Sequence, residues 1–146
     1  MQIPGHLALA LAQSRLPPFR ASRRLLFFLL LASLFPDIVD KTIGYVFQAM
    51  PNGRHYAHNV FSLLGFSLLV TLVWGKTAGW AWFSGYLGHL LADNIQRVPW
   101  FFPLKKYRFN KGRLAFEPAQ LLREGFFLAL VLLLNHFVLP RRKIRL

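Results

Sequence analysis

Two ionisable residues, His89 and Asp93, lie four positions apart in the otherwise apolar segment Gly-Tyr-Leu-Gly-His-Leu-Leu-Ala-Asp at 85–93. Residues with this spacing share one face of an α-helix. An ionisable pair placed where hydrocarbon or a packed core is expected is costly unless a partner matches it. A metal ion held by one imidazole and one carboxylate is such a partner. We favour this interpretation over a structural hydrogen-bonded pair.

The composition indicates the setting of this pair. Of the 146 residues, 55% are hydrophobic, and the chain has 15 phenylalanines and no cysteine. This apolar content exceeds what a soluble domain of the same length needs, so the sequence predicts a small polytopic membrane protein. Because thiolate ligands are absent, a bound metal must have nitrogen and oxygen ligands, which favours zinc, manganese or a similar ion.

The charge is strongly positive, with 18 Lys and Arg against 5 Asp and Glu. In a soluble protein this balance would suggest nucleic acid. Here the basic residues cluster in the connections between apolar segments, at 15–24, 105–113 and 141–145, where they can meet anionic lipid headgroups. We therefore expect membrane lipids as partners and no nucleic acid. Of the acidic residues, Glu117 and Glu124 are expected to pair with nearby arginines or to lie at the membrane interface.

Five apolar segments predict an all-α polytopic membrane bundle of about four to five helices, in one domain over residues 1–146. They cover about 5–14, 24–35, 56–74, 78–95 and 121–139. We expect the second to stop at Pro36, because proline breaks a helix interior. The third has 19 residues and is long enough to span a bilayer, which takes about 20. The first lacks the charged start of a signal peptide.

Short connections make successive helices antiparallel, so helix starts and ends alternate between the two ends of the bundle. On this arrangement seven polar residues fall at one end: His6, Asp37, Asp40, His55, His58, His89 and Asp93. Histidines scattered through a core for packing alone would not be expected to gather at one end of the bundle. We therefore predict a metal site at that end. His136 falls at the opposite end and is expected to be interfacial.

Local sequence leaves some roles open. Asp37 follows a proline at an expected helix boundary, where the roles of helix cap and metal ligand are equally open. His6 is a candidate only because it lies at the shared end. Of His55 and His58, which are three apart, His58 is the better candidate because it is nearer the apolar run, whereas His55 can lie in the loop.

The ordered motifs resemble those of the YdjM-type family of membrane-bound, metal-dependent hydrolases. The motifs are His6, Phe-Pro-Asp-Ile-Val-Asp at 35–40, Arg-His-Tyr-Ala-His-Asn at 54–59, Gly-His-Leu-Leu-Ala-Asp at 88–93 and Phe-Phe-Pro-Leu at 101–104. The resemblance implies a distant relation to zinc-dependent phospholipase C and the zinc single-strand nucleases. The chain departs from the family pattern where Ala57 and Asn59 replace Thr and Ser, and where Gly53 replaces a histidine.

Carried onto this sequence, the resemblance implies one to three divalent ions, with zinc favoured, and the metal ligands His6, Asp37, Asp40, His58, His89 and Asp93. It implies hydrolysis of a phosphoester by a metal-activated water, with a lipid-linked substrate favoured. Asp37 or Asp40 would then act as base or bridge, and Arg54 would contact phosphate. The location implied is the cytoplasmic (inner) membrane of a bacterium or archaeon. A metal-ion or proton-coupled transport component and a non-catalytic membrane scaffold with a structural metal remain as alternatives.

Overall fold

A computed structural model describes residues 1–20, 22–94, 98–112 and 117–137. The elements are α1 (Ile3–Gln13), α2 (Arg23–Lys41), the π-helical turn η1 (Thr42–Val46), α3 (Val60–Trp74), α4 (Lys76–Asp93) and α5 (Pro118–Phe137). No strand occurs in these ranges, which confirms the predicted all-helical architecture with five α-helices. The predicted basic segment at 141–145 lies outside the described residues.

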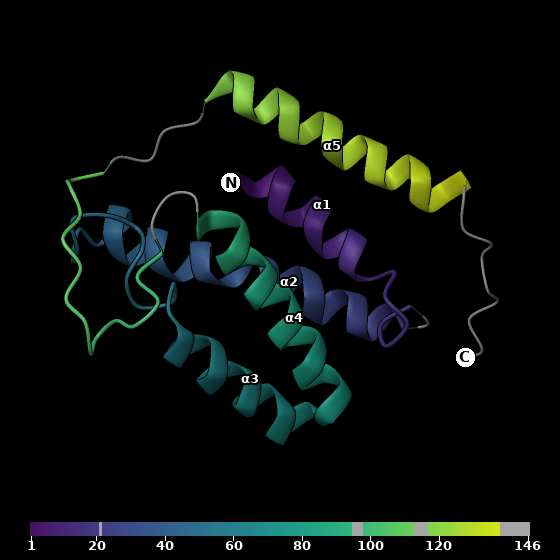
Figure 1. The fold of residues 1–146 in the computed structure, drawn as a ribbon, viewed down its shortest axis with the longest axis horizontal. Coiled ribbons are helices and arrows are strands. Elements are labelled where there is room, and N and C mark those ends of the chain that lie inside the picture. Colours follow the sequence, from purple (N-terminus) through teal and green to yellow (C-terminus); the bar gives the residue numbers. More distant parts are fainter. Residues whose placement is uncertain (21, 95–97, 113–116, 138–146) are drawn as a thin grey trace.

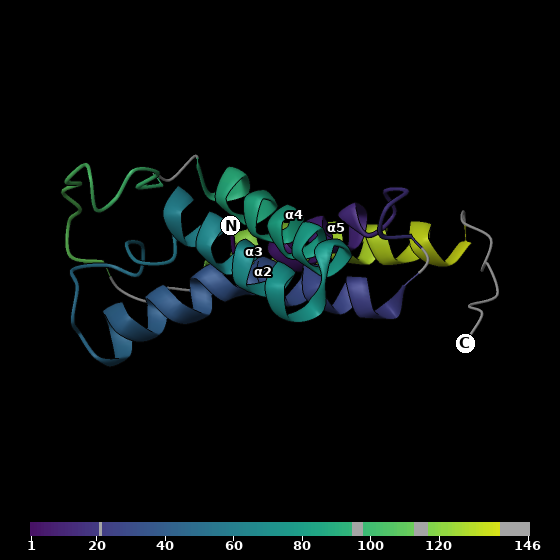
Figure 2. The same cartoon turned by 90° about the horizontal axis from the view of Figure 1, so that it is seen from below.

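The helices alternate in direction along the chain, as the short connections predict (Figure 1). Helix α2 packs on α1 and α4, α3 packs on α4, and α5 packs on α1. Helices α1 and α5 therefore run parallel, with their N-termini at the same end (Figure 1). The loops at 47–59 and 98–112 gather at that end in both views (Figures 1 and 2). This end carries the starts of α1 and α5 and the ends of α2 and α4.

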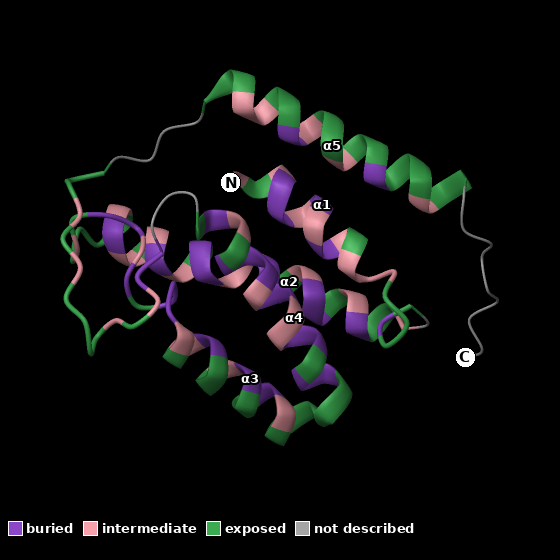
Figure 3. Ribbon diagram, in the orientation of Figure 1, coloured by how far each residue is buried: buried purple, intermediate pink, exposed green. Residues whose placement is uncertain are grey.

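Helices α2 and α4 approach closely enough that Gly85 is required between them. A Cβ at Gly85 would lie 2.4 Å from the carbonyl oxygen of Leu29 and 3.2 Å from the Cβ of Ala32. Leu29, Tyr86 and Leu90 are fully buried beside this contact. The buried faces of α1, α2 and α4 turn toward one another, whereas most of α5 is exposed (Figure 3). The core that positions the polar cluster is thus the packing of α1, α2 and α4.

The prediction that the second helix stops at Pro36 is wrong. Helix α2 continues through Pro36 to Lys41, and Pro36 is fully buried. A proline inside a helix removes one hydrogen bond and costs about 3 kcal/mol. Beyond it, Asp37 and Asp40 make side-chain contacts that hold the last turn in place. Asp37 therefore lies inside a helix and does not cap the next one.

Helix α3 begins at Val60, four residues later than predicted. The Asn59 side chain accepts a hydrogen bond from the amide of Ser62 at 2.9 Å and caps the helix. The 15 residues of α3 extend about 22 Å at 1.5 Å per residue, short of a hydrocarbon core of about 30 Å. Among the described helices, α5 alone is long and apolar enough to cross a membrane by length and composition.

Candidate metal centre

Four buried side chains bring their ligand atoms together at the end of the bundle where α2 and α4 terminate. One ligand atom from each of Asp37, His58, His89 and Asp93 lies within 4.8 Å of the others. Asp37 comes from the last turns of α2 and His58 from the loop before α3. His89 and Asp93 come from one face of α4, as their spacing predicts. We refer to these residues as the four-ligand group.

The hydrogen bonds of the two histidines fix how their rings face. Nδ1 of His58 donates to Oδ2 of Asp40 at 2.8 Å, because a carboxylate can only accept. Nδ1 of His89 donates to the backbone carbonyl of Ser33 at 2.7 Å. In each neutral ring the remaining nitrogen, Nε2, then carries a lone pair. Partners of this kind orient metal-binding histidines in proteins.

The two Nε2 atoms face each other at 3.1 Å. Two lone pairs at this distance repel unless a proton or a cation lies between them. Burial opposes the charged form of His58, but the nearby carboxylates of Asp37 and Asp40 outweigh burial and raise its pKa. A metal ion satisfies the same requirement, since two ligands of a tetrahedral ion bonded at about 2.0–2.1 Å lie about 3.3 Å apart.

The carboxylates complete the four-ligand group. Oδ1 of Asp37 lies 3.6 Å from Nε2 of His58 and 4.0 Å from Nε2 of His89. Oδ2 of Asp93 lies 3.9 Å and 4.0 Å from the same two nitrogens. Oδ1 of Asp37 is buried and accepts no hydrogen bond from any described residue. Oδ2 of Asp93 is also buried and is contacted by the guanidinium of Arg54 as an ion pair at 3.2 Å. Buried acceptors without donors are rare in native proteins, and a cation at the centre would satisfy them.

His6 lies on the other side of the two carboxylates. Its Nε2 is 3.4 Å from Oδ1 of Asp93 and 3.9 Å from Oδ2 of Asp37. Its ring stacks on that of His89 with centroids 4.0 Å apart. Neither ring nitrogen of His6 has a hydrogen-bond partner in the described ranges. Each carboxylate thus presents one oxygen to the four-ligand group and the other to His6.

Asp40 lies beside the four-ligand group and organises the loop that carries His58. Its carboxylate accepts hydrogen bonds from four successive backbone amides, those of residues 55–58, at 2.7–3.1 Å. It also accepts the bond from Nδ1 of His58. Five donors therefore converge on one fully buried carboxylate. This arrangement explains why residues 56–58 are not helical, although the sequence predicts a helix from residue 56.

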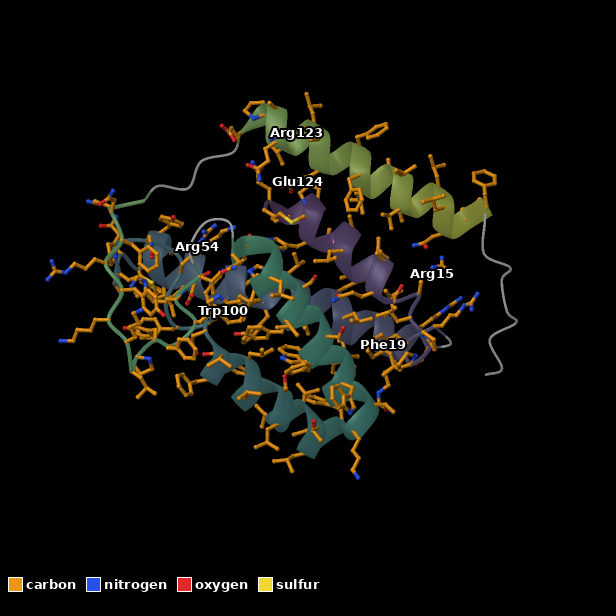
Figure 4. All side chains as sticks on the ribbon, viewed as in Figure 1. Arg15, Phe19, Arg54, Trp100, Arg123 and Glu124 are labelled. Carbon is orange, nitrogen blue, oxygen red and sulfur yellow. The ribbon has the colours of Figure 1, made fainter. Side chains whose placement is uncertain are left out.

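Positive groups surround the carboxylates. Nη2 of Arg54 lies 3.2 Å from Oδ2 of Asp93, and Nζ of Lys41 lies 2.5 Å from Oδ2 of Asp37. The amino group of Met1 contacts Oδ1 of Asp93. Figure 4 shows Arg54 at the end of the bundle that carries the loops. Exposed cations of the second loop extend this positive surface: Lys105, Lys106, Arg108 and Lys111.

The two remaining histidines, His55 and His136, lie apart from the four-ligand group. The ring of His55 packs against those of Phe102 and Phe109, with centroids 5.3 Å and 5.1 Å away. Burial lowers the pKa of His55, although the charge of Asp40 acts in the opposite direction. His136 lies in the last turn of α5 and is exposed.

Sequence reasoning missed the contacts of Lys41 and Glu124. Lys41 is four residues after Asp37, a spacing that does signal an ion pair on a helix. Glu124 was expected to pair with an arginine or to lie at the membrane interface. It is buried instead and accepts hydrogen bonds from backbone amides at the start of α1.

The described residues form a helical bundle with a buried candidate metal site of two histidines and two aspartates. One exposed apolar helix, α5, is long enough to cross a membrane. The chain belongs to the YdjM inner membrane protein family, whose model matches residues 1–143. This confirms the predicted family and the membrane location. The chain has no match among the curated proteins or the solved structures with which it was compared.

Proposed function

We propose that the four-ligand group binds a divalent metal ion and that the protein is a membrane-bound hydrolase of phosphoesters, with a lipid-linked substrate. The observation that carries the metal site is the pair of facing Nε2 atoms, 3.1 Å apart, each with its proton held at Nδ1. The buried Oδ1 of Asp37, which accepts no hydrogen bond from any described residue, supports it. Nitrogen and oxygen ligands of this kind suit zinc.

The proposed ligands of the first ion are Asp37, His58, His89 and Asp93. His6 and the second oxygens of Asp37 and Asp93 are the proposed ligands of a further ion, within the one to three that the family resemblance implies. Such an ion would replace the contacts of these oxygens with Lys41 and the amino group of Met1. Asp40 has its lone pairs engaged by five donors. We therefore assign Asp40 to positioning His58 rather than to the ligand set, which leaves Asp37 as the candidate base or bridge.

A bound divalent metal would lower the pKa of a coordinated water toward neutrality and stabilise charge on phosphoester oxygens. Arg54 lies partly exposed at the edge of the centre, and its guanidinium can bind a phosphate with two parallel hydrogen bonds. The exposed cations at 105–111 would attract an anionic headgroup. A distant relation to zinc-dependent phospholipase C and zinc nucleases, and a polytopic topology in a bacterial or archaeal membrane, form part of the proposal.

A structural metal is the second candidate, because burial favours it. His6, His58, His89 and Asp93 all have 0% exposure, and closed shells of four protein ligands are typical of structural sites. The same metal ion would then hold α2, α4 and the loop before α3 together without reacting. A transport role has less support, since the polar residues gather at one end of the bundle instead of crossing it.

The test uses the full chain purified in mild detergent. We expect stoichiometric zinc or manganese in the parent, loss of the metal in Asp93→Asn, and retention in the control His136→Asn. Hydrolysis is then measured on vesicles of phosphatidic acid and phosphatidylcholine. Activity in the parent and the control, but not in Asp93→Asn, supports the hydrolase. Metal binding without hydrolysis in any protein favours the structural metal, and a folded parent without metal refutes both candidates.

A further inference from the structure

The carboxylate of Glu124 lies buried between α5 and the first turn of α1 (Figure 4). It accepts hydrogen bonds from the amide of Gln2 at 3.0 Å and 2.9 Å, one to each oxygen, and from the amide of Gly5 at 3.0 Å. The side chain of Gln120, one turn earlier in α5, donates to it at 2.7 Å. An acidic side chain in a largely apolar and exposed helix thus has a defined set of partners.

These contacts do the work of an N-terminal cap. The first amides of a helix have no partner within the helix, and the cap residue of α1, Gln2, makes no capping bond with its own side chain. In a capping box, two side chains near the helix start bond the amides of the cap residue and of the third helical residue. Those are the amides of Gln2 and Gly5, so one carboxylate from α5 takes both roles.

The capped turn is the one that carries His6. Gly5, the residue before it, allows the close approach, because a Cβ there would lie 2.7 Å from Oε2 of Glu124. The ring of His6 stacks on that of His89. Its Nε2 faces the second oxygens of Asp37 and Asp93. Any shift of this turn relative to α2 and α4 changes those distances.

We propose that Glu124 is a positioning residue that caps α1 from α5 and so fixes His6 against the two carboxylates of the metal centre. The inference rests on the proposed metal centre for its consequence, but the capping itself does not depend on a bound metal. Helix α5, the candidate membrane span, supplies no ligand itself. Through Glu124 it contacts the start of α1, on which it packs, and α1 carries His6 to the centre.

A matched control lies at the other end of the same helix pair. Arg15 follows α1 and donates to the side chain and backbone carbonyl of Asn135 at 2.5 Å and 3.0 Å. Figure 4 places Arg15 at the opposite end of α1 from Glu124. Asn135→Ala therefore removes a polar contact between α1 and α5 without touching the capped turn.

The experiment compares four variants with the parent, as full chains in mild detergent, with Co²⁺ as the probe. Glu124→Gln keeps the size but puts an NH₂ group where an amide donor needs an acceptor. His6→Gln removes the proposed ligand itself. Asn135→Ala is the control, and the double change Gln2→Asp with Glu124→Gln supplies a cap from within α1, since Asp is a preferred cap residue. The readouts are Co²⁺ affinity, its visible spectrum and amide hydrogen exchange over residues 2–10.

We expect Glu124→Gln to weaken Co²⁺ binding about 10- to 100-fold, as loss of an orienting partner does, and to give the spectrum of His6→Gln. Amide exchange should accelerate over the first turn of α1, whereas Asn135→Ala should match the parent. The double variant should recover both readouts. If amide exchange over residues 2–10 is unchanged in Glu124→Gln, the inference is overturned. It is also overturned if the double variant recovers neither the amide exchange nor the Co²⁺ binding of the parent. A parent that binds no Co²⁺ but shows the expected exchange change refutes the metal centre and leaves the capping role established.

Discussion

Replacing Asp40 with Asn tests whether one carboxylate holds the loop at residues 55–58. In the structure, Oδ1 accepts two hydrogen bonds and Oδ2 accepts three. Asn keeps a single carbonyl oxygen and places an NH₂ group against the remaining donors. Even in the better orientation, two hydrogen bonds are lost.

The expected loss of stability follows from these bonds. A hydrogen bond to a charged group contributes roughly 1.5–3 kcal/mol, so the lost bonds amount to about 3–6 kcal/mol. For a chain of this size 1 kcal/mol shifts the unfolding midpoint by about 2–4 °C. We therefore expect Asp40→Asn to lower the midpoint by at least about 6 °C.

The assay is thermal unfolding followed by circular dichroism in mild detergent with a chelator present, so that no metal contributes. The control is Glu117→Gln, the same chemical change at an exposed carboxylate, where surface substitutions usually change stability by less than about 0.5 kcal/mol. A midpoint for Asp40→Asn within about 2 °C of the control would refute the argument, because a carboxylate that organises the loop cannot be neutralised without loss.

Two further predictions concern packing and pH. Gly85→Ala should destabilise the protein by roughly 1–3 kcal/mol, because the new Cβ would meet the backbone of Leu29. At Gly125, where nothing lies within 4 Å, the same change should stabilise the protein by about 0.5–1 kcal/mol. Denaturant unfolding measures both variants, and equal changes in unfolding free energy at the two glycines would contradict the close packing at Gly85. Burial lowers the pKa of His55 below its ordinary value of about 6.5. As pH falls below about 6.5, the unfolded chain therefore binds a proton that the folded chain excludes, and stability is lost. His55→Phe should make the decrease in unfolding free energy between pH 7 and pH 5 smaller, and an unchanged pH profile would argue against the depressed pKa.

The residues that meet at the centre could be predicted because two simple regularities hold. His89 and Asp93 share a helix face through their spacing, and the alternation of helix direction brings the start of α1 beside the ends of α2 and α4 (Figure 1). The same reasoning placed His136 away from the centre, in the last turn of α5. Both regularities are local or topological, so they can be read from the order of the chain.

The contacts that fix the geometry could not be predicted in this way. Asp40 reaches amides 15 to 18 positions further along the chain, and its five bonds outweigh the helical tendency of residues 56–59. Glu124 lies next to Arg123, which suggested a charged partner, but its partner is an amide 122 positions earlier. Pro36 predicts a helix end by local rules, whereas tertiary contacts continue the helix. The misses at Asp40 and Glu124 thus reflect long-range polar contacts that have no local signal.

The separation of the cluster along the chain sets an order in which it can assemble during synthesis. Asp40 and the loop at 55–58 are near in sequence and can form their bonds as soon as α2 and that loop have emerged. The contact of Met1 with Asp93 spans 92 positions, which at about 5–20 residues per second corresponds to about 5–18 s of translation. Until α4 is made, His6 has neither the ring of His89 to stack on nor the carboxylate of Asp93 to face. Assembly of the complete four-ligand group is therefore a late event, after most of the bundle has been synthesised.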